Sequence, residues 1–303
     1  MQDLLIRAGC FVAIIILGIV LRRVGFFNDN TFEALTKIVL KITLPAAIIK
    51  NFASSDVDVS MLSLSLLGLI GGLLYVAVAL IISIGKSKEQ RAFDLLNVPG
   101  YNIGVFALPF VSSFLGPMGV VTASVFDVGN SFVCLGGTYG LASSVKSGHG
   151  FSFKRVCKAL ATSVPFLCYI IMLPLSLLKI TIPAPIVTCA DIIASSNGFL
   201  AMLMIGVGFK LKLNKQQLGY VTKVVVLRYA IAAVAALAFY YLTPFSLEVR
   251  RTLVVLAFSP ISASVVGFTR ELGEDAGLSS TINSICIIIS IVAMVALLSV
   301  MLG

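Results

Sequence analysis

Two stretches of the chain combine helix-breaking residues with small polar side chains inside otherwise apolar sequence. They span residues 97–109 and 257–267. The residues concerned are Pro99, Gly100, Asn102, Gly104 and Pro109 in the first stretch, and Ser259, Pro260, Ser262 and Ser264 in the second. A broken helix leaves backbone N–H and C=O groups without partners, and each costs several kcal/mol in hydrocarbon. We therefore expect both stretches to face a protein interior or a cavity.

The composition places these stretches in a membrane protein. The chain has 303 residues, is 59% hydrophobic and 12% charged, and has a mean hydropathy of +1.08. A bilayer crossing takes about 20 helical residues, which allows roughly ten crossings. The net charge of +9 is explained by basic cytoplasmic loops, so no nucleic-acid partner is predicted. The six cysteines lie in apolar runs without metal-ligand spacing, so neither a metal nor a cofactor is predicted.

Apolar runs between polar breaks predict an all-α protein with ten transmembrane helices. A polar linker at 143–155 divides it into five-helix repeats at 1–142 and 156–303. The helices are expected at 4–21, from the turn 28–31 to 49, 60–84, 92–114, 118–142, 156–178, 186–209, 218–242, 247–269 and 276–302. Because five is odd, the second repeat would enter the membrane inverted relative to the first.

The loops give an orientation. Basic residues are concentrated after the first and third predicted helices and in the linker, for example at Arg22, Lys86 and Lys154. Such loops stay in the cytoplasm. We therefore predict a multi-pass protein of the cell (inner) membrane with both termini on the extracytoplasmic side.

The two broken helices occupy matching places. Aligning Leu115-Gly116 with Leu272-Gly273 carries Pro260 close to Gly104. Matching breaks in two repeats are a pointer to a transport site, although a simple kink is the alternative for each helix. Half-helix N-termini that meet near the midplane would favour a small anion. The predicted substrate-binding residues are Asn102, Gly104, Pro109, Asn130, Ser259, Pro260, Ser262 and Ser264.

Two charged residues lie deep in predicted helices. Asp127 is interpreted either as a site for a coupling proton or cation, or as a structural carboxylate hydrogen-bonded to Asn130, and Asn283 is grouped with it. A fixed negative charge would repel an anionic substrate, so Asp127 is not expected to bind one. Arg228 either pairs with the anion or extends its long side chain to the inner surface.

These residues resemble a known family. Asn102 to Pro109, Phe114 to Gly119 and Phe126 to Asn130 resemble the fourth and fifth helices of bacterial auxin efflux carrier (AEC) family proteins. Ser259 to Ser264, the turn 271–275 and Thr281 to Ser284 resemble the ninth and tenth. The chain departs from many relatives at Ala107, where they have glycine, and it lacks the long cytosolic loop of plant members.

The resemblance implies a bile-acid-symporter-like fold in which helices 4 and 9 cross at their breaks. It implies a scaffold of helices 1, 2, 6 and 7, a transport domain of helices 3–5 and 8–10, and an elevator-type movement. It further implies a carboxylate substrate such as malate, malonate or an auxin-like acid, coupling to Na⁺ or H⁺ or none, and a homodimer through the scaffold.

Other classes of function fit the residues less well. An intramembrane enzyme is not predicted, because the chain has neither an HExxH motif nor embedded acids at metal-ligand spacing. A channel would need repeated polar rings along its spans. A membrane receptor that binds an organic acid in the same cavity stays open as the alternative to a transporter.

Overall fold

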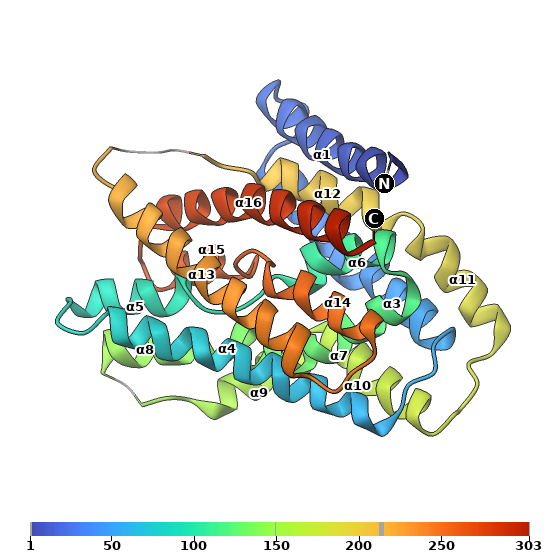
Figure 1. Cartoon of the computed structure of the whole chain (residues 1–303). Coiled ribbons are helices and arrows are strands. Elements are labelled where there is room, and N and C mark those ends of the chain that lie inside the picture. Colours follow the sequence, from blue (N-terminus) through green and yellow to red (C-terminus); the bar gives the residue numbers. More distant parts are fainter. Residues whose placement is uncertain (1, 149, 212–214, 303) are drawn as a thin grey trace.

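The computed structural model describes residues 2–148, 150–211 and 215–302, which fold as helices joined by short loops (Figure 1). The first half contains α1 (Gln2–Arg23), α2 (Asp29–Ile38), η1 (Val39–Thr43), α3 (Leu44–Ala53), η2 (Val59–Leu62), α4 (Ser63–Ile82), α5 (Lys88–Asn97), η3 (Ile103–Ala107), α6 (Leu108–Phe114), α7 (Gly116–Phe132), η4 (Val133–Gly137) and α8 (Thr138–Ser147). The second half contains α9 (Phe153–Thr162), α10 (Val164–Leu177), α11 (Ala184–Ala194), α12 (Asn197–Gly208), α13 (Leu218–Leu242), α14 (Leu247–Ala257), α15 (Val265–Glu271) and α16 (Ala276–Leu302). Across these ranges no residue is in a strand, so the all-α prediction is confirmed.

Several helices are long and apolar enough to cross a bilayer. Six qualify within the described ranges, and α9 with α10 makes a seventh if that bent pair counts as one span. The remaining predicted helices do not qualify by length and composition. Two of them are broken at residues 98–102 and 258–264, and residues 29–53 carry Lys37, Lys41 and Lys50. The chain is therefore a multi-pass membrane protein, and the full set of ten crossings stays a prediction.

The structure differs from the prediction at the linker and in the sixth helix. α8 continues to Ser147, so the helix extends into the predicted linker at 143–155. The predicted sixth helix is bent by 78° between α9 and α10. Pro165 explains the bend, because it has no N–H to donate to the carbonyl one turn earlier. Ser163 caps the new helix, its hydroxyl accepting a hydrogen bond from the Phe166 N–H at 3.4 Å.

The helices pack as two groups. α1 contacts α12, and α3 contacts α10 and α11, whereas α4 contacts α7 and α13 contacts α14. Close approaches explain two of these pairs. A Cβ at Gly206 would lie 2.2 Å from the Ile15 carbonyl oxygen, and a Cβ at Gly129 would lie 1.8 Å from that of Ser65. Glycine is therefore required where α12 meets α1 and where α7 meets α4.

The core of the fold is α7. α7 contacts helices of both groups, among them α3, α4, α10 and α14.

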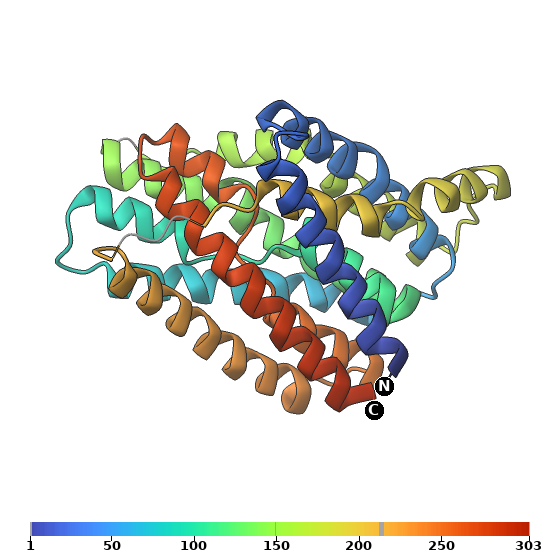
Figure 2. The ribbon, with the colours of Figure 1, turned by 90° about the horizontal axis from the view of Figure 1, so that it is seen from above.

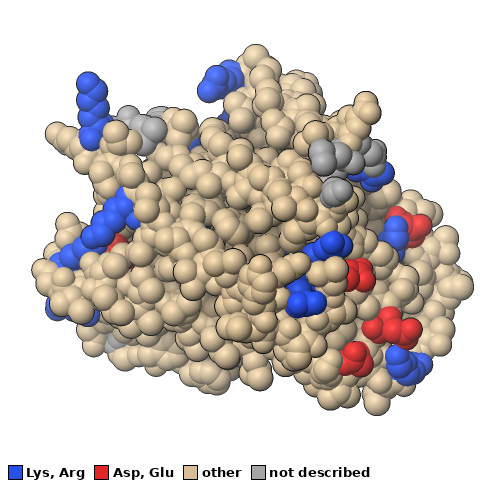
Figure 3. All heavy atoms as spheres, viewed as in Figure 1, with Lys and Arg blue, Asp and Glu red and all other residues tan. Residues whose placement is uncertain are grey.

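The N- and C-terminal ends lie next to each other in both views (Figure 2). Figure 3 shows a broad area without charged side chains in the middle of one face, with Lys and Arg at its left and charged side chains of both signs at its right. Such a face suits contact with lipid.

Candidate functional site

The two predicted helix breaks are present and they contact each other. α5 ends at Asn97 and the helix resumes at Ile103, while α14 ends at Ala257 and α15 begins at Val265. The backbone N–H of Asn102 donates a hydrogen bond to the carbonyl of Pro260 at 2.9 Å. The backbone of each unwound segment thus supplies a hydrogen-bond partner for the backbone of the other.

Arg228 of α13 binds backbone carbonyls of both unwound segments. Its guanidinium donates hydrogen bonds to the carbonyls of Val98 at 2.8 Å, Gly100 at 2.6 Å and Ser259 at 2.9 Å. The side chain is 1% exposed and lies over the Tyr75 ring, 4.9 Å from its centroid. The interpretation that Arg228 reaches the inner surface is therefore wrong.

The electrostatics of the crossing follow from the helix ends. α5 and α14 both end at the crossing, and a helix C-terminus carries roughly half a unit of negative charge. Two such ends add to about one negative charge, which the single positive charge of Arg228 balances. The helix 103–114, formed by η3 and α6, begins at the crossing with N–H groups that have no intrahelical acceptor. The crossing therefore presents backbone donors that have no acceptor within the helix.

Asn130 of α7 fixes the first break by pairing with its backbone. Its side-chain carbonyl accepts from the Tyr101 N–H at 3.1 Å, and its amide donates to the Tyr101 carbonyl at 2.9 Å. The same amide donates to Asp127 at 2.7 Å. The other carboxylate oxygen of Asp127 accepts from the Tyr169 hydroxyl of α10 at 3.1 Å. Asp127 is thus held by one residue of each helix group.

A cavity of about 110 Å³ lies at this crossing. Among the predicted site residues it is lined by Asn102, Gly104, Asp127, Asn130, Ser262 and Ser264. The Ser262 and Ser264 hydroxyls lie 2.9 Å apart, and Ser264 also donates to the Cys134 carbonyl at 3.3 Å. A cavity of this size is smaller than a drug-sized pocket, so it suits a solute of few carbon atoms.

The other predicted site residues lie outside this cavity. Pro109 is buried in the first turn of α6, and Pro260 takes part through its backbone carbonyl. Ser259 is buried, and its hydroxyl has no hydrogen-bond partner among the described residues. Asn283 lies on α16. Arg228 is directed at the backbone carbonyls rather than into the cavity. Of the eleven predicted site residues, six therefore line the cavity and five lie outside it.

A family model matches part of the chain. Residues 10–151 match the model of a family described as membrane transport protein. The match covers a little under half of the chain. The match confirms the resemblance to auxin efflux carriers, and it indicates a membrane transporter. No curated protein matches the chain. The matched segment contains the first break together with Asp127 and Asn130.

Several residues that line the cavity were not predicted. Tyr169, Ser163 and Phe166 come from the start of α10. The other unpredicted lining residues are Leu40, Leu44, Tyr101, Ile103, Val105, Ser131, Cys134, Leu135, Pro165 and Ala263. The π-helical segments η1, η3 and η4 all contribute to the wall. Such segments often occur at functional sites, but their sequences have no distinguishing pattern.

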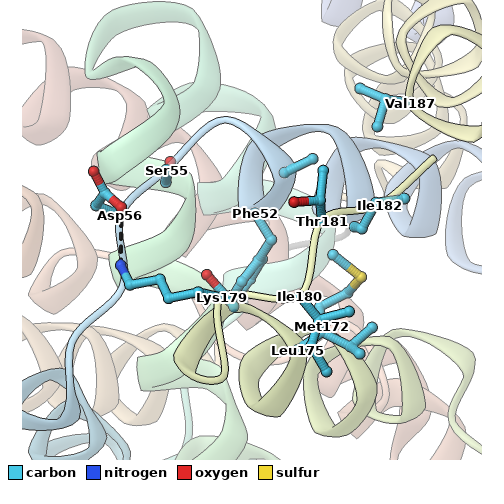
Figure 4. A pocket seen from close by; sticks show the side chains of 12 residues that line it. Phe52, Ser55, Asp56, Met172, Leu175, Lys179, Ile180, Thr181, Ile182 and Val187 are labelled. Carbon is cyan, nitrogen blue, oxygen red and sulfur yellow. Dashed lines mark hydrogen bonds and ion pairs between the residues drawn. The ribbon is translucent and has the colours of Figure 1, made fainter. Parts of the chain in front are cut away.

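A larger cavity of about 230 Å³ lies elsewhere (Figure 4). It is lined by the end of α3, the end of α10 and the loop to α11, and it contains none of the predicted site residues. On its wall, the exposed Lys179 ammonium lies 2.9 Å from the Asp56 carboxylate. The Lys179 ammonium lowers the pKa of the Asp56 carboxyl through its hydrogen bond and its charge. The smaller cavity is the better candidate site, because it combines buried polar side chains with free helix-start amides.

Proposed function

We propose that the protein transports a small organic anion, such as malate, malonate or an auxin-like acid, through the cavity at the crossing. The observation that carries this proposal is the position of the cavity at the start of helix 103–114, where residues 102–105 line it. Backbone N–H groups at a helix start bind carboxylates well. Asn102 and the serines supply neutral hydrogen-bonding groups without the cost of a buried fixed charge.

An elevator-type alternating-access mechanism accounts for the arrangement of the helices. The proposed scaffold is α1–α3 with α9–α12, and the proposed transport domain is α4–α8 with α13–α16. Leu44 and Tyr169 of the first group line the cavity, as do Asn102 and Ser262 of the second. A solute between them would be exposed by sliding one group past the other. The contacts of α3 and α10 with α7 form the proposed sliding surface.

The proposed ten-helix architecture is two inverted repeats, 1–142 and 156–303, joined by a cytoplasmic linker at 143–155. One backbone feature supports it. Gly116 and Gly273, which the proposed alignment pairs, both have a positive φ, of 66° and 71°. Each follows the second half of a broken helix. Adjacent termini also agree with an even number of crossings. We further propose a homodimer through the scaffold helices.

Asp127 is the proposed site for a coupling proton or sodium ion. It lines the cavity, and an unpaired carboxylate there would repel an anion. Its hydrogen bond to Tyr169 joins the proposed transport domain to the proposed scaffold. A cation or proton on Asp127 would remove this repulsion as the substrate enters.

Flux into proteoliposomes tests the function. We expect purified protein to carry a labelled carboxylate above empty liposomes, and Asn102→Ala to reduce the initial rate at least tenfold. Asn51→Ala is the matched control, because Asn51 is also buried but donates to the Ala47 carbonyl in α3. Runs with and without sodium and a pH gradient identify the coupling ion.

The same experiment distinguishes a transporter from a receptor. Saturable binding of a carboxylate without flux would favour the receptor. Neither flux nor binding for dicarboxylates, keto acids and indole acids would overturn the proposal.

Cysteine accessibility tests the proposed topology. Ser147 and Ser246 are exposed and lie at the end of α8 and before α14. With the exposed Cys10, Cys157 and Cys189 replaced by serine, we expect a membrane-impermeant maleimide added to intact cells to label Ser246→Cys and not Ser147→Cys. If only Ser147→Cys were labelled, the orientation would be the reverse of the proposed one.

A further inference from the structure

The helix α9 carries two lysines that form no ion pair with any other described residue. Lys154 and Lys158 are exposed, and neither takes part in a salt bridge within the described ranges. The sequence has no Asp or Glu anywhere between Asp127 and Asp191. Arg155 lies over the Tyr139 ring, 5.0 Å from its centroid. The helix is therefore strongly basic and has no acidic partner nearby in sequence.

The side chains of α9 form three stripes. Successive residues turn by about 100° around a helix. Val156 and Leu160 form one stripe and are buried in a small apolar cluster with Phe166. Phe153, Cys157 and Ala161 form an exposed apolar stripe next to it, and Lys154 and Lys158 follow on the far side. One stripe thus faces protein, one is apolar and exposed, and one is basic and exposed.

The direction of α9 suits the membrane surface. It makes an angle of 78° with α10, the adjoining part of the proposed sixth crossing. Spanning helices tilt on average by about 20° from the bilayer normal. A helix nearly perpendicular to one therefore lies close to the membrane plane. An exposed apolar stripe beside a basic stripe is typical of helices at the boundary between headgroups and acyl chains.

We propose that α9 is an interfacial helix whose Lys154 and Lys158 bind the headgroups of anionic phospholipids in the cytoplasmic leaflet. Phe153 enters the acyl region beside them. Anionic lipids attract basic residues close to the membrane surface, by roughly fivefold in affinity for each Lys or Arg. Because Ser163 and Phe166 line the cavity immediately after α9, a lipid-anchored α9 also holds the wall of the proposed transport site.

The exposed Cys157 lies on the apolar stripe and allows a direct test. We use the full chain with Cys10 and Cys189 replaced by serine, a bimane fluorophore on Cys157, and nanodiscs of phosphatidylcholine that contain a minor fraction of acyl-chain spin-labelled lipid. We expect spin-labelled phosphatidylglycerol to quench the bimane at least threefold more than spin-labelled phosphatidylcholine. The preference should fall as NaCl is raised from about 50 to 500 mM, below and above physiological screening.

The variant Lys154→Gln/Lys158→Gln should lose this preference while quenching by phosphatidylcholine persists. Lys88→Gln/Lys223→Gln removes the same charge from exposed positions on α5 and α13 and should keep it. Equal quenching by both lipids, or no quenching by either, would overturn the proposal. Full competition by soluble glycerol phosphate would also overturn it, because it indicates a free-anion site. None of these readouts depends on flux, so the test is separate from that of the transport function.

Discussion

Arg228→Gln is expected to reduce carboxylate flux at least a hundredfold and to lower the thermal stability of the purified protein. The guanidinium donates to three buried carbonyls, on Val98, Gly100 and Ser259. A buried acceptor that loses its donor costs about 1–3 kcal/mol. Glutamine is shorter and neutral, so it would leave both the carbonyls and the two negative helix ends uncompensated. We expect the two breaks to separate as a result.

Arg228→Lys should have an intermediate effect. Lysine keeps the positive charge, but its single ammonium does not reproduce the planar fork with which arginine contacts several acceptors. The control is Lys223→Gln on the same helix, whose side chain is exposed. Both flux and the melting temperature are measured, each against the unmodified protein. If Arg228→Gln kept flux within twofold and the same melting temperature, Arg228 would not hold the crossing together.

The helix breaks could be predicted because proline and glycine act locally. Pro99 and Gly100 lie inside the first gap in the helix, and Pro260 lies inside the second. Gly100 adopts a φ of 86°, a conformation that other residues avoid. The polar character of Asn102, Asn130 and Asp127 in apolar surroundings was a second signal. These residues do line the cavity.

The partners of these residues could not be predicted, because contacts between distant segments have no local signal. Tyr169 is separated from Asp127 by 42 positions and Arg228 from Val98 by 130. An arginine in an apolar helix can reach the surface or bind buried carbonyls, and the sequence is the same in both cases. The size of the 78° bend before α10 could not be predicted either, because a proline near a helix start and one at a kink look alike.

A side chain at position 104 is expected to abolish transport without unfolding the protein. Gly104 lines the cavity, and a Cβ there would lie 3.2 Å from the Leu44 side chain, 3.7 Å from Asp127 and 3.9 Å from the Tyr169 hydroxyl. The two branches of valine would extend further, into the space proposed for the substrate. They would also push Asp127 away from Tyr169 and so break this contact between the two helix groups. We expect Gly104→Val to lower the initial rate of flux at least fiftyfold.

The matched control lies after the other break. At Gly267 of α15 a Cβ would meet nothing within 4 Å, so Gly267→Val should keep flux within about twofold. Gly104→Ala should fall between the two, because its contact with Leu44 needs only a shift of a few tenths of an ångström. Size-exclusion profiles and melting temperatures of all three variants establish that they are folded. If the folded Gly104→Val protein kept wild-type flux, the substrate would not pass through this cavity, because the valine side chain fills the space proposed for it.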